Sequence, residues 1–390
     1  MNNVNINYST AGLGTPAIGE DFISGLIFYT NAYPSGFSAS ANTAEIFSID
    51  EAEDLGITLA AAVSASTNID VIHYHIDEFF RANPTGDLWV MITTGTSASS
   101  SFSEIVTLQN AAGGKLRQVG IYEQVNFSAA TLSTIQTQID SCVSDNKPLE
   151  ALYQANFSGV STSAFVDLST STAKNVTALL GQDGAAVGAG LYNVIGKSIG
   201  TVGLTLGAIS RAAVNQSIAW VQNFQMSTTE LDTLAFANGA LLSTLTDSAI
   251  SAVDAKRYVF LRKFVGIGGS YFNNDYTSII NTNTYSTIHL NRTIHKASRN
   301  VRTALLPSIS APIYFNTDGS IALYSILFFK AEAESALAAM VSAGEISQYK
   351  VIINAKQNVL STRNLVITIQ LIPVGVADTI TVNIGFVLAI

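Results

Sequence analysis

Through the first half of the chain, apolar runs bounded by turn residues alternate with segments in which apolar residues recur at helical spacing. The apolar runs predict buried strands at residues 22–29, 88–92, 116–122 and 149–157. The helical spacing predicts helices at 52–59, 68–81, 104–110, 129–143 and 172–180, and Ser48 with Glu51 forms a capping box before the first helix. Strands that alternate with helices in this way are typical of an α/β sheet with crossover helices.

The pattern changes in the second half of the chain. Strands are predicted at 217–224 and 256–266, long helices at 288–306 and 321–343, and three closing strands at 348–355, 364–372 and 379–390. A helix pair followed by strands indicates a separate α+β unit. We therefore expect a chain of the α/β and α+β classes, with a helix-flanked mixed sheet core at 21–245, an α+β domain at 246–373, and extended strand arms at 1–20 and 374–390.

The two ends of the chain have strand patterns of their own. Near the start, Val4, Ile6 and Tyr8 alternate with asparagines before a glycine- and proline-containing joint. Near the end, alternating apolar residues share one face, and these are Ile380, Val382, Ile384, Phe386, Leu388 and Ile390. An exposed strand of this kind would template aggregation. It is either buried centrally within its own subunit or added to the sheet of a neighbouring copy.

Composition adds a second indication of hidden surface. Charged residues make up 12% of the 390 residues and hydrophobic residues 48%, and this charged share is about half that of an ordinary soluble protein. A large core would explain it, but we favour surface that is covered by other subunits. The mean hydropathy is +0.32, yet no run of about 18 apolar residues occurs, so we expect no stable membrane association. The N-terminus lacks a secretory pattern, and the single Cys142 excludes an intramolecular disulfide.

The charges are distributed unevenly. Residues 1–114 contain twelve acidic residues and a single basic one, Arg81. In the predicted helix at 288–306, four basic residues are spaced by four, three and three positions along one face, and these are Arg292, Lys296, Arg299 and Arg302. This stripe is either a solvated helix face or a surface that meets an acidic partner. Direct nucleic-acid binding is disfavoured, because the pI is about 4.9 and no aromatic platform accompanies the stripe.

Candidate chemical motifs are weak. The segment 190–198 places five residues between two glycines where a Walker A loop has four, so it indicates a small-residue helix or loop that packs closely on a neighbour. His73, His75 and Asp77 would share a face on a strand, but on the predicted helix they diverge, which indicates surface or helix-end histidines. The acidic residues at 50–54 suit the first turn of a helix. No enzyme, cofactor or metal site is predicted.

Several segments occur in a characteristic order along nearly the whole chain. They are SIDEAEDLGI at 48–57, YHIDEFFR at 74–81, a glycine-rich stretch at 200–222, NRTIHKASR at 291–299 leading to Leu306-Pro307, then Asp318-Gly319, and MVSAGEI at 340–346 before the closing strands. In this order and spacing the chain resembles the tail sheath proteins of contractile phages and related injection systems, in particular a compact branch found in phages and prophages. None of these segments is a catalytic motif.

The resemblance implies a structural subunit that stacks in hexameric rings to form a helical sheath around a tail tube. Its partners would be other copies of itself, the tail tube protein, and the baseplate and tail terminator proteins. Terminal arms would add strands to adjacent subunits, and contraction would drive the tube through the host envelope. The basic stripe would then be a tube-facing element. The protein would be assembled in the host bacterial cytoplasm and function in the virion tail.

Two other classes remain open on the sequence alone. Another tail or capsid component, such as a tube or baseplate protein, is disfavoured by the two long helices, because tube proteins are usually shorter and dominated by a β-barrel. A cytoplasmic α/β enzyme is the third class, and no constellation of residues supports it.

Overall fold

The chain divides into two compact units in the computed structural model, which describes residues 20–59, 68–95, 97–382, 384 and 386. The boundary lies between Ile309 and Ser310, whereas the sequence pattern places it after residue 245. The difference arises because residues beyond 245 pair with the first unit. Strand β12 (Ser278–Ile279) joins β6 (Thr172–Ala173), and Val259 bridges Leu179. Each unit is described by itself.

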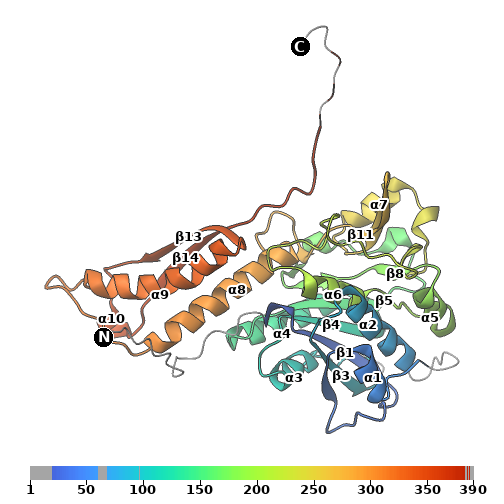
Figure 1. Cartoon of the computed structure of the whole chain (residues 1–390), viewed down its shortest axis with the longest axis horizontal. Helices are drawn as coiled ribbons and strands as arrows, with labels where there is room; N and C mark the ends of the chain where they lie inside the picture. The colour runs from blue at the N-terminus through green and yellow to red at the C-terminus, as the bar shows by residue number, and fades with distance from the viewer. Residues whose placement is uncertain (1–19, 60–67, 96, 383, 385, 387–390) are drawn as a thin grey trace, which may run out of the picture. The chain divides into compact units, whose positions relative to one another are not determined.

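A six-stranded mixed sheet forms the centre of the first unit (Figure 1). Its order is β2-β3-β1-β4-β5-β7; the strands β3, β1, β4, β5 and β7 run parallel, and β2 is antiparallel at one edge. The predicted α/β sheet is therefore confirmed. The strands are β1 (Ser24–Thr30), β2 (Thr43–Ile46), β3 (Leu88–Thr94), β4 (Gln118–Asn126), β5 (Glu150–Asn156) and β7 (Val176–Ala178).

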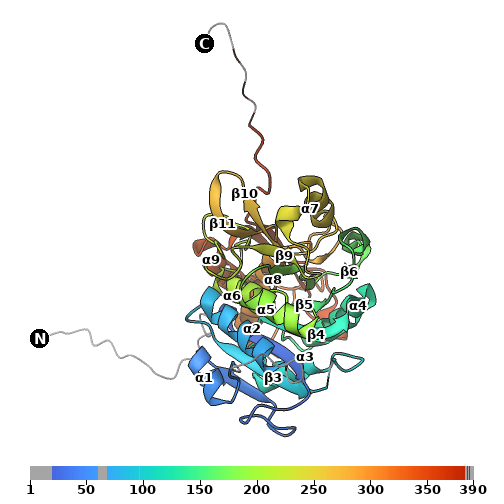
Figure 2. The ribbon, with the colours of Figure 1, turned by 90° about the vertical axis from the view of Figure 1, so that its right-hand side faces the viewer.

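Helices cover both faces of this sheet (Figure 2). On β1, Gly25 faces Leu108 of α3. The next residue, Leu26, lies on the other face, where its side chain and that of Val202 of α6 both lie next to Gly120 of β4. Neighbouring residues of a strand point to opposite faces, so α3 and α6 lie on opposite sides. The helices of this unit are α1 (Ile49–Asp54), α2 (Ile69–Ala82), α3 (Glu104–Ala111), α4 (Ala129–Ser144), α5 (Val187–Ile195), α6 (Val202–Arg211), α7 (Asp247–Asp254) and α8 (Ile288–Leu305).

Three segments differ from the sequence prediction. Residues 172–180 are not a helix; they contain β6 and β7, because the edge of β5 supplies backbone partners to residues 176–178. Residues 217–224 form turns rather than a strand, and the Arg211 guanidinium donates a hydrogen bond to the Asn223 carbonyl within them. The strand predicted at 256–266 is confined to β10 (Leu261–Phe264), which pairs with β11 (Ile267–Phe272). A further pair joins β8 (Gly181–Asp183) to β9 (Leu234–Phe236).

The second unit is a helix on a two-stranded antiparallel ribbon. The strands β13 (Ile346–Ile353) and β14 (Ile367–Pro373) pair with each other, and the short helix α10 (Val359–Thr362) lies between them in the chain. Helix α9 (Leu323–Ser342) contributes a buried face made of Phe329, Ala333, Leu337 and Met340. These residues are spaced by four, four and three, which places them on one side of the helix. The described residues beyond β14 contain no strand, so the strand predicted at 379–390 is not formed there.

Helices α2 and α6 approach each other closely because two residues of α6 lack side chains. A Cβ atom on Gly203 would lie 1.9 Å from the His75 carbonyl oxygen, and one on Gly207 would lie 2.4 Å from the Phe79 carbonyl oxygen. Both obstacles are backbone atoms, which cannot turn away as a side chain can. The small residues after position 198 therefore serve helix packing within the first unit.

Helix α8 rests on the sheet through polar groups. The buried Asn291 donates hydrogen bonds to the Lys174 carbonyl and to Glu150, at 2.6 and 3.3 Å. Glu150 also accepts from Asn175 at 2.8 Å and lies 3.1 Å from Nδ1 of His295. Burial raises the pKa of Glu150 to about 8 and lowers the pKa of His295 to about 3. The carboxyl therefore holds the proton at neutral pH, and the contact joins uncharged groups.

The glycine contacts predict that Gly203→Ala destabilises the first unit by about 3 kcal/mol or more, because its Cβ would force α2 and α6 apart. Urea denaturation followed by circular dichroism measures this loss. Gly190→Ala is the matched control, since Gly190 is exposed on α5 with nothing within 4 Å of its Cβ position. That change should stabilise the protein by up to about 1 kcal/mol. Equal effects at the two positions would contradict the proposed close approach.

The Glu150 contact predicts a pH-dependent effect of Glu150→Gln. Because the folded state favours the protonated carboxyl, the free energy of unfolding of the natural chain should fall as the pH rises from 4.5 through about 8. The amide stays neutral, so the variant should lose about 1 kcal/mol or less at pH 6 and be more stable than the natural chain at pH 9. Urea midpoints at the two pH values test this. The control Asp145→Asn, at an exposed carboxyl, should change the urea midpoint equally at both pH values.

Candidate assembly surfaces

The basic stripe on α8 is not an open surface in the structure. Arg292 is buried and donates hydrogen bonds to the Ala212 carbonyl at 3.1 Å and to the Asp21 carbonyl at 3.2 Å. Lys296 Nζ lies 2.6 Å from Oδ2 of Asp21, and Arg299 lies 2.7 Å from Oδ1. Three of the four predicted tube-facing residues are thus engaged with their own chain, so the solvated helix face is not found for these three. Arg302, the fourth, is exposed.

Asp21 is the centre of this cluster. Burial acts to raise its pKa, but the hydrogen bond and charge of Lys296, together with the charges of Arg299 and Arg292, outweigh burial and hold the pKa below its usual value. Burial is also the main cause that lowers the pKa of Arg299 to about 10, and the neighbouring Arg117 adds to it. The negative charge of the Asp21 carboxylate therefore offsets the repulsion between the neighbouring cations, which are partly buried.

The cluster fixes the point where the N-terminal segment enters the fold. Besides the Asp21 contacts, the Phe22 carbonyl accepts a hydrogen bond from Ser210 of α6 at 2.7 Å, and the Asp21 carbonyl accepts one from Gln118 of β4 at 3.4 Å. The strand candidates Val4, Ile6 and Tyr8 precede this point and lie outside the described residues. Residues 1–19 carry no charge, so Glu20 and Asp21 are the first charged residues of the chain. In the sequence, this start of charged residues at Glu20 and Asp21 is the one feature that could have pointed to Asp21 as a partner of the basic helix.

The C-terminal candidates are exposed. Ile380, Val382, Ile384 and Phe386 are 81, 71, 93 and 110% exposed, respectively. Leu388 lies outside the described residues. These four side chains are therefore not covered within the described part of the second unit, and their addition to a neighbouring copy stays a prediction.

The ribbon of the second unit offers strand edges. β13 and β14 pair only with each other among the described residues, so each has an outer edge on which backbone N–H and C=O groups lack a strand partner. Isolated two-stranded sheets are marginally stable in water. This ribbon gains support from α9 on one side and remains able to accept a further strand at either edge.

The four histidines are buried or nearly so, whereas the sequence pattern indicates that His73 and His75 are surface or helix-end residues. His73 lies 2.8 Å from Glu53, and His289 lies 2.6 Å from Asp275. His75 has no exposed surface and lies among the rings of Phe28, Tyr74 and Tyr122, and burial lowers its pKa to about 3. The carboxylate partners of His73, His289 and His295 belong to other elements or loops, which the spacing of the histidines does not reveal.

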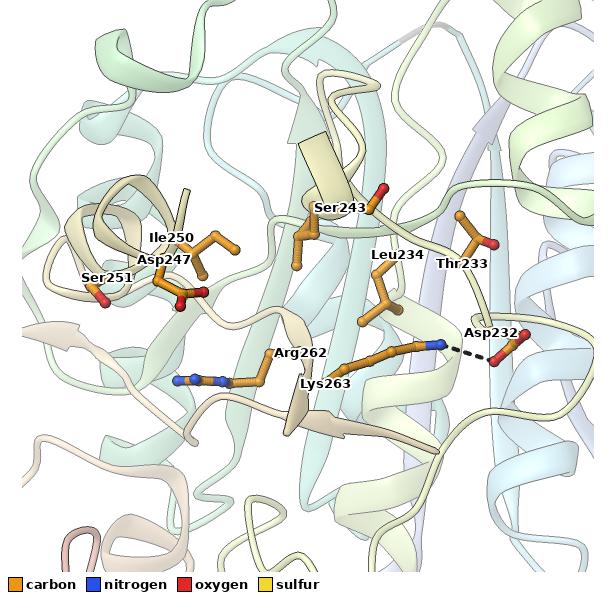
Figure 3. Close-up of a pocket in the computed structure, with 10 residues that line it drawn as sticks. Asp232, Thr233, Leu234, Ser243, Asp247, Ile250, Ser251, Arg262 and Lys263 are labelled. Carbon is orange, nitrogen blue, oxygen red and sulfur yellow. Dashed lines mark hydrogen bonds and ion pairs between the residues drawn. The ribbon is translucent and has the colours of Figure 1, made fainter. Parts of the chain in front are cut away.

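A surface pocket of about 320 Å³ lies between the loop before α7 and the strand β10 (Figure 3). Its charged side chains include Lys263, which pairs with Asp232 at 3.0 Å, and Arg262, which lies over the ring of Phe264. The lining contains hydroxyl groups but neither histidine nor cysteine. Within the described ranges, no group of three His, Cys, Asp or Glu residues could hold a metal ion. No described helix is both long and apolar enough to span a membrane.

Solved structures share this fold over nearly the whole chain. The contracted helical sheath of the anti-feeding prophage matches with a TM-score of 0.64 at 12% identity, covering 97% of this chain and 99% of that one. The contracted sheath complex of an extracellular contractile injection system, PVC, matches with a TM-score of 0.64 at 13% identity, covering 99% and 97%. A sheath tail protein from Listeria innocua matches with a TM-score of 0.52 at 8% identity, covering 90% and 94%.

The sequence itself matches family models at both ends. The N-terminal domain of DUF2586 matches residues 1–276, and the C-terminal domain of DUF2586 matches residues 285–390. No curated protein matches the sequence. The two models adjoin in the expected order, and together they account for most of the chain, including the sheet, α8 and the ribbon. The chain therefore belongs to the DUF2586 family.

Proposed function

We propose that this protein is a structural subunit of a contractile sheath. Copies would stack as hexameric rings into a helical sleeve around a tail tube, and contraction of the sleeve would drive the tube through a host envelope. The observation that carries the proposal is the combination of a sheath-protein fold over the whole chain with an exposed apolar C-terminal segment and an open ribbon. In a monomer, the apolar C-terminal segment and the strand edges of the ribbon would both stay exposed to water. In a polymer, the C-terminal segment of one copy can cover the ribbon of the next.

Strand exchange would link the copies. The alternating residues from Ile380 to Phe386 would add to an outer edge of the ribbon on a neighbouring copy, with the apolar side chains covering its surface. The N-terminal segment that holds Val4, Ile6 and Tyr8 would add to another edge. Links of this kind keep their backbone hydrogen bonds while the bodies of the subunits rearrange. The work of contraction would then come from better packing between subunits, without nucleotide hydrolysis.

Other contacts would connect the sleeve to the rest of the particle. The tail tube protein would lie inside the sleeve, and baseplate and tail terminator proteins would bound its two ends. Arg302 is exposed on α8 and remains a candidate for contact with an acidic tube surface. The protein would be assembled in a bacterial cytoplasm and function in a virion tail or a tail-derived injection machine.

Electron microscopy of the purified chain tests the proposal. We expect hollow sleeves from the natural chain, and none from a variant that carries Ile380→Asn, Val382→Asn and Ile384→Asn, because the apolar face of the added strand would be lost. Thr379→Asn with Thr381→Asn alters the opposite face and should leave sleeves intact. A stable monomer of the natural chain at high concentration would reject the sheath function. Normal sleeves from the triple variant would reject strand exchange alone.

The Asp21 cluster predicts that Asp21→Asn destabilises the first unit by about 2 kcal/mol, because Lys296 and Arg299 lose their shared carboxylate. Since salt screens the remaining repulsion, the loss should shrink as sodium chloride increases. Adding Lys296→Met and Arg299→Met should cost less than the sum of the separate effects. Urea denaturation measures each value. Asp145→Asn, at the exposed end of α4, should change stability by less than about 0.5 kcal/mol; a loss there as large as at Asp21 would refute a specific role.

A further inference from the structure

The ribbon of the second unit carries basic residues and no acidic ones. From residue 346 to residue 377 the chain contains three cations and no acidic residue. The three cations, Lys350, Lys356 and Arg363, are all exposed. In a chain whose formal net charge is −9, a segment of this length without an acid forms a distinct electrostatic surface. Two of the three cations lie in the connection between β13 and β14.

That connection has a defined structure. The Gln357 side chain donates a hydrogen bond to the Val366 carbonyl at 2.9 Å and accepts one from the Val366 N–H at 2.7 Å, which closes the turn. Asn358 caps α10 by accepting from Ser361 at 3.2 Å, and Arg363 ends it with φ of 53°. Side-chain amides thus fix a turn that has little core of its own.

The turn presents apolar and basic side chains together. Leu360 is 72% exposed and Val366 56% exposed, and they lie within the same connection as Lys356 and Arg363. We call these four residues the ribbon tip. An apolar centre with charged residues around it is the usual composition of a protein–protein contact. A partner for this surface would carry acidic residues around exposed apolar ones.

The first unit carries such a surface at the corner around α1. Phe47 and Leu59 are each 51% exposed on either side of this helix. The carboxylates of Asp50 and Asp54 lie between them in the chain and are exposed. We call these four residues the α1 corner. The corner is also fixed in shape, since Ser48 accepts a hydrogen bond from the Glu51 N–H and Glu51 accepts one from the Phe47 N–H.

We propose that the ribbon tip of one copy docks on the α1 corner of another copy. The two surfaces are complementary in charge, and each has two exposed apolar residues for the other to cover. They are different surfaces of the same chain, so the contact is heterologous and can repeat without closing on itself, as an open helical polymer requires. The inference rests on the proposed sheath function and adds a side-chain contact to the strand exchange described above.

Charge exchange tests the contact. Lys356→Glu with Arg363→Glu should reduce the fraction of protein that sediments as sleeves at least tenfold, and so should Asp50→Lys with Asp54→Lys. One chain that carries all four changes restores opposite charges across the contact, and its sedimenting fraction should return to within about twofold of the natural chain. Circular dichroism and urea midpoints confirm that each variant is folded. The sleeves of the restored variant are checked by electron microscopy.

The control reverses one charge elsewhere. Asp145→Lys changes an exposed carboxylate at the end of α4 in the same way as Asp54→Lys at the end of α1, and it should leave assembly unchanged. Sleeve formation by either reversed pair at the natural level would overturn the contact. Failure of the folded four-change variant to assemble would also overturn it, because the ribbon tip would then bind a different acidic partner such as a tube. Failure of the natural chain to assemble would instead reject the sheath function.

Discussion

Strand edges are the constraint on which the architecture depends, because backbone groups at an edge need a partner or a cover. The first unit meets this need in part. Helices cover both faces of its six-stranded sheet, and Val259 bridges Leu179 just after the edge strand β7. The second unit does not meet it, since β13 and β14 form a ribbon of two strands. The second unit, residues 310–390, therefore has strand edges that a further strand can join.

Polar contacts add to the buried apolar residues Ile288, Ala297 and Val301 in attaching α8 to the first unit. Glu150 joins Asn291 and His295 in a neutral cluster, while Asp21 holds Lys296 and Arg299 in a charged one. Both are specific in geometry, because hydrogen bonds and ion pairs fix the rotation of the helix more narrowly than apolar packing does. The charged cluster also fastens the beginning of the fold, so the N-terminal segment and α8 share one anchoring point.

The low proportion of charged residues is accompanied by many exposed apolar side chains. Leu323, Tyr324 and Leu327 on α9 are each more than half exposed, as are Ile380, Val382, Ile384 and Phe386. A protein that stayed monomeric would rarely leave so much apolar surface uncovered. Few charges and many exposed apolar residues both fit the proposed covering of this surface by other subunits.

The sequence by itself determined the long elements, including α2, α4, α8, α9 and the buried strands. Apolar residues at helical spacing are easily told from the continuous apolar runs of buried strands. The sequence also identified the apolar C-terminal segment. Tertiary structure alone decided where chain segments with weak patterns settle: residues 176–178 became a strand because β5 offered an edge. Tertiary structure also determined what the basic stripe contacts. The spacing correctly placed the basic residues on one helix, but their partner Asp21 lies more than 270 residues away in the chain. Local periodicity reports which face a residue occupies, and only the folded chain determines what that face meets.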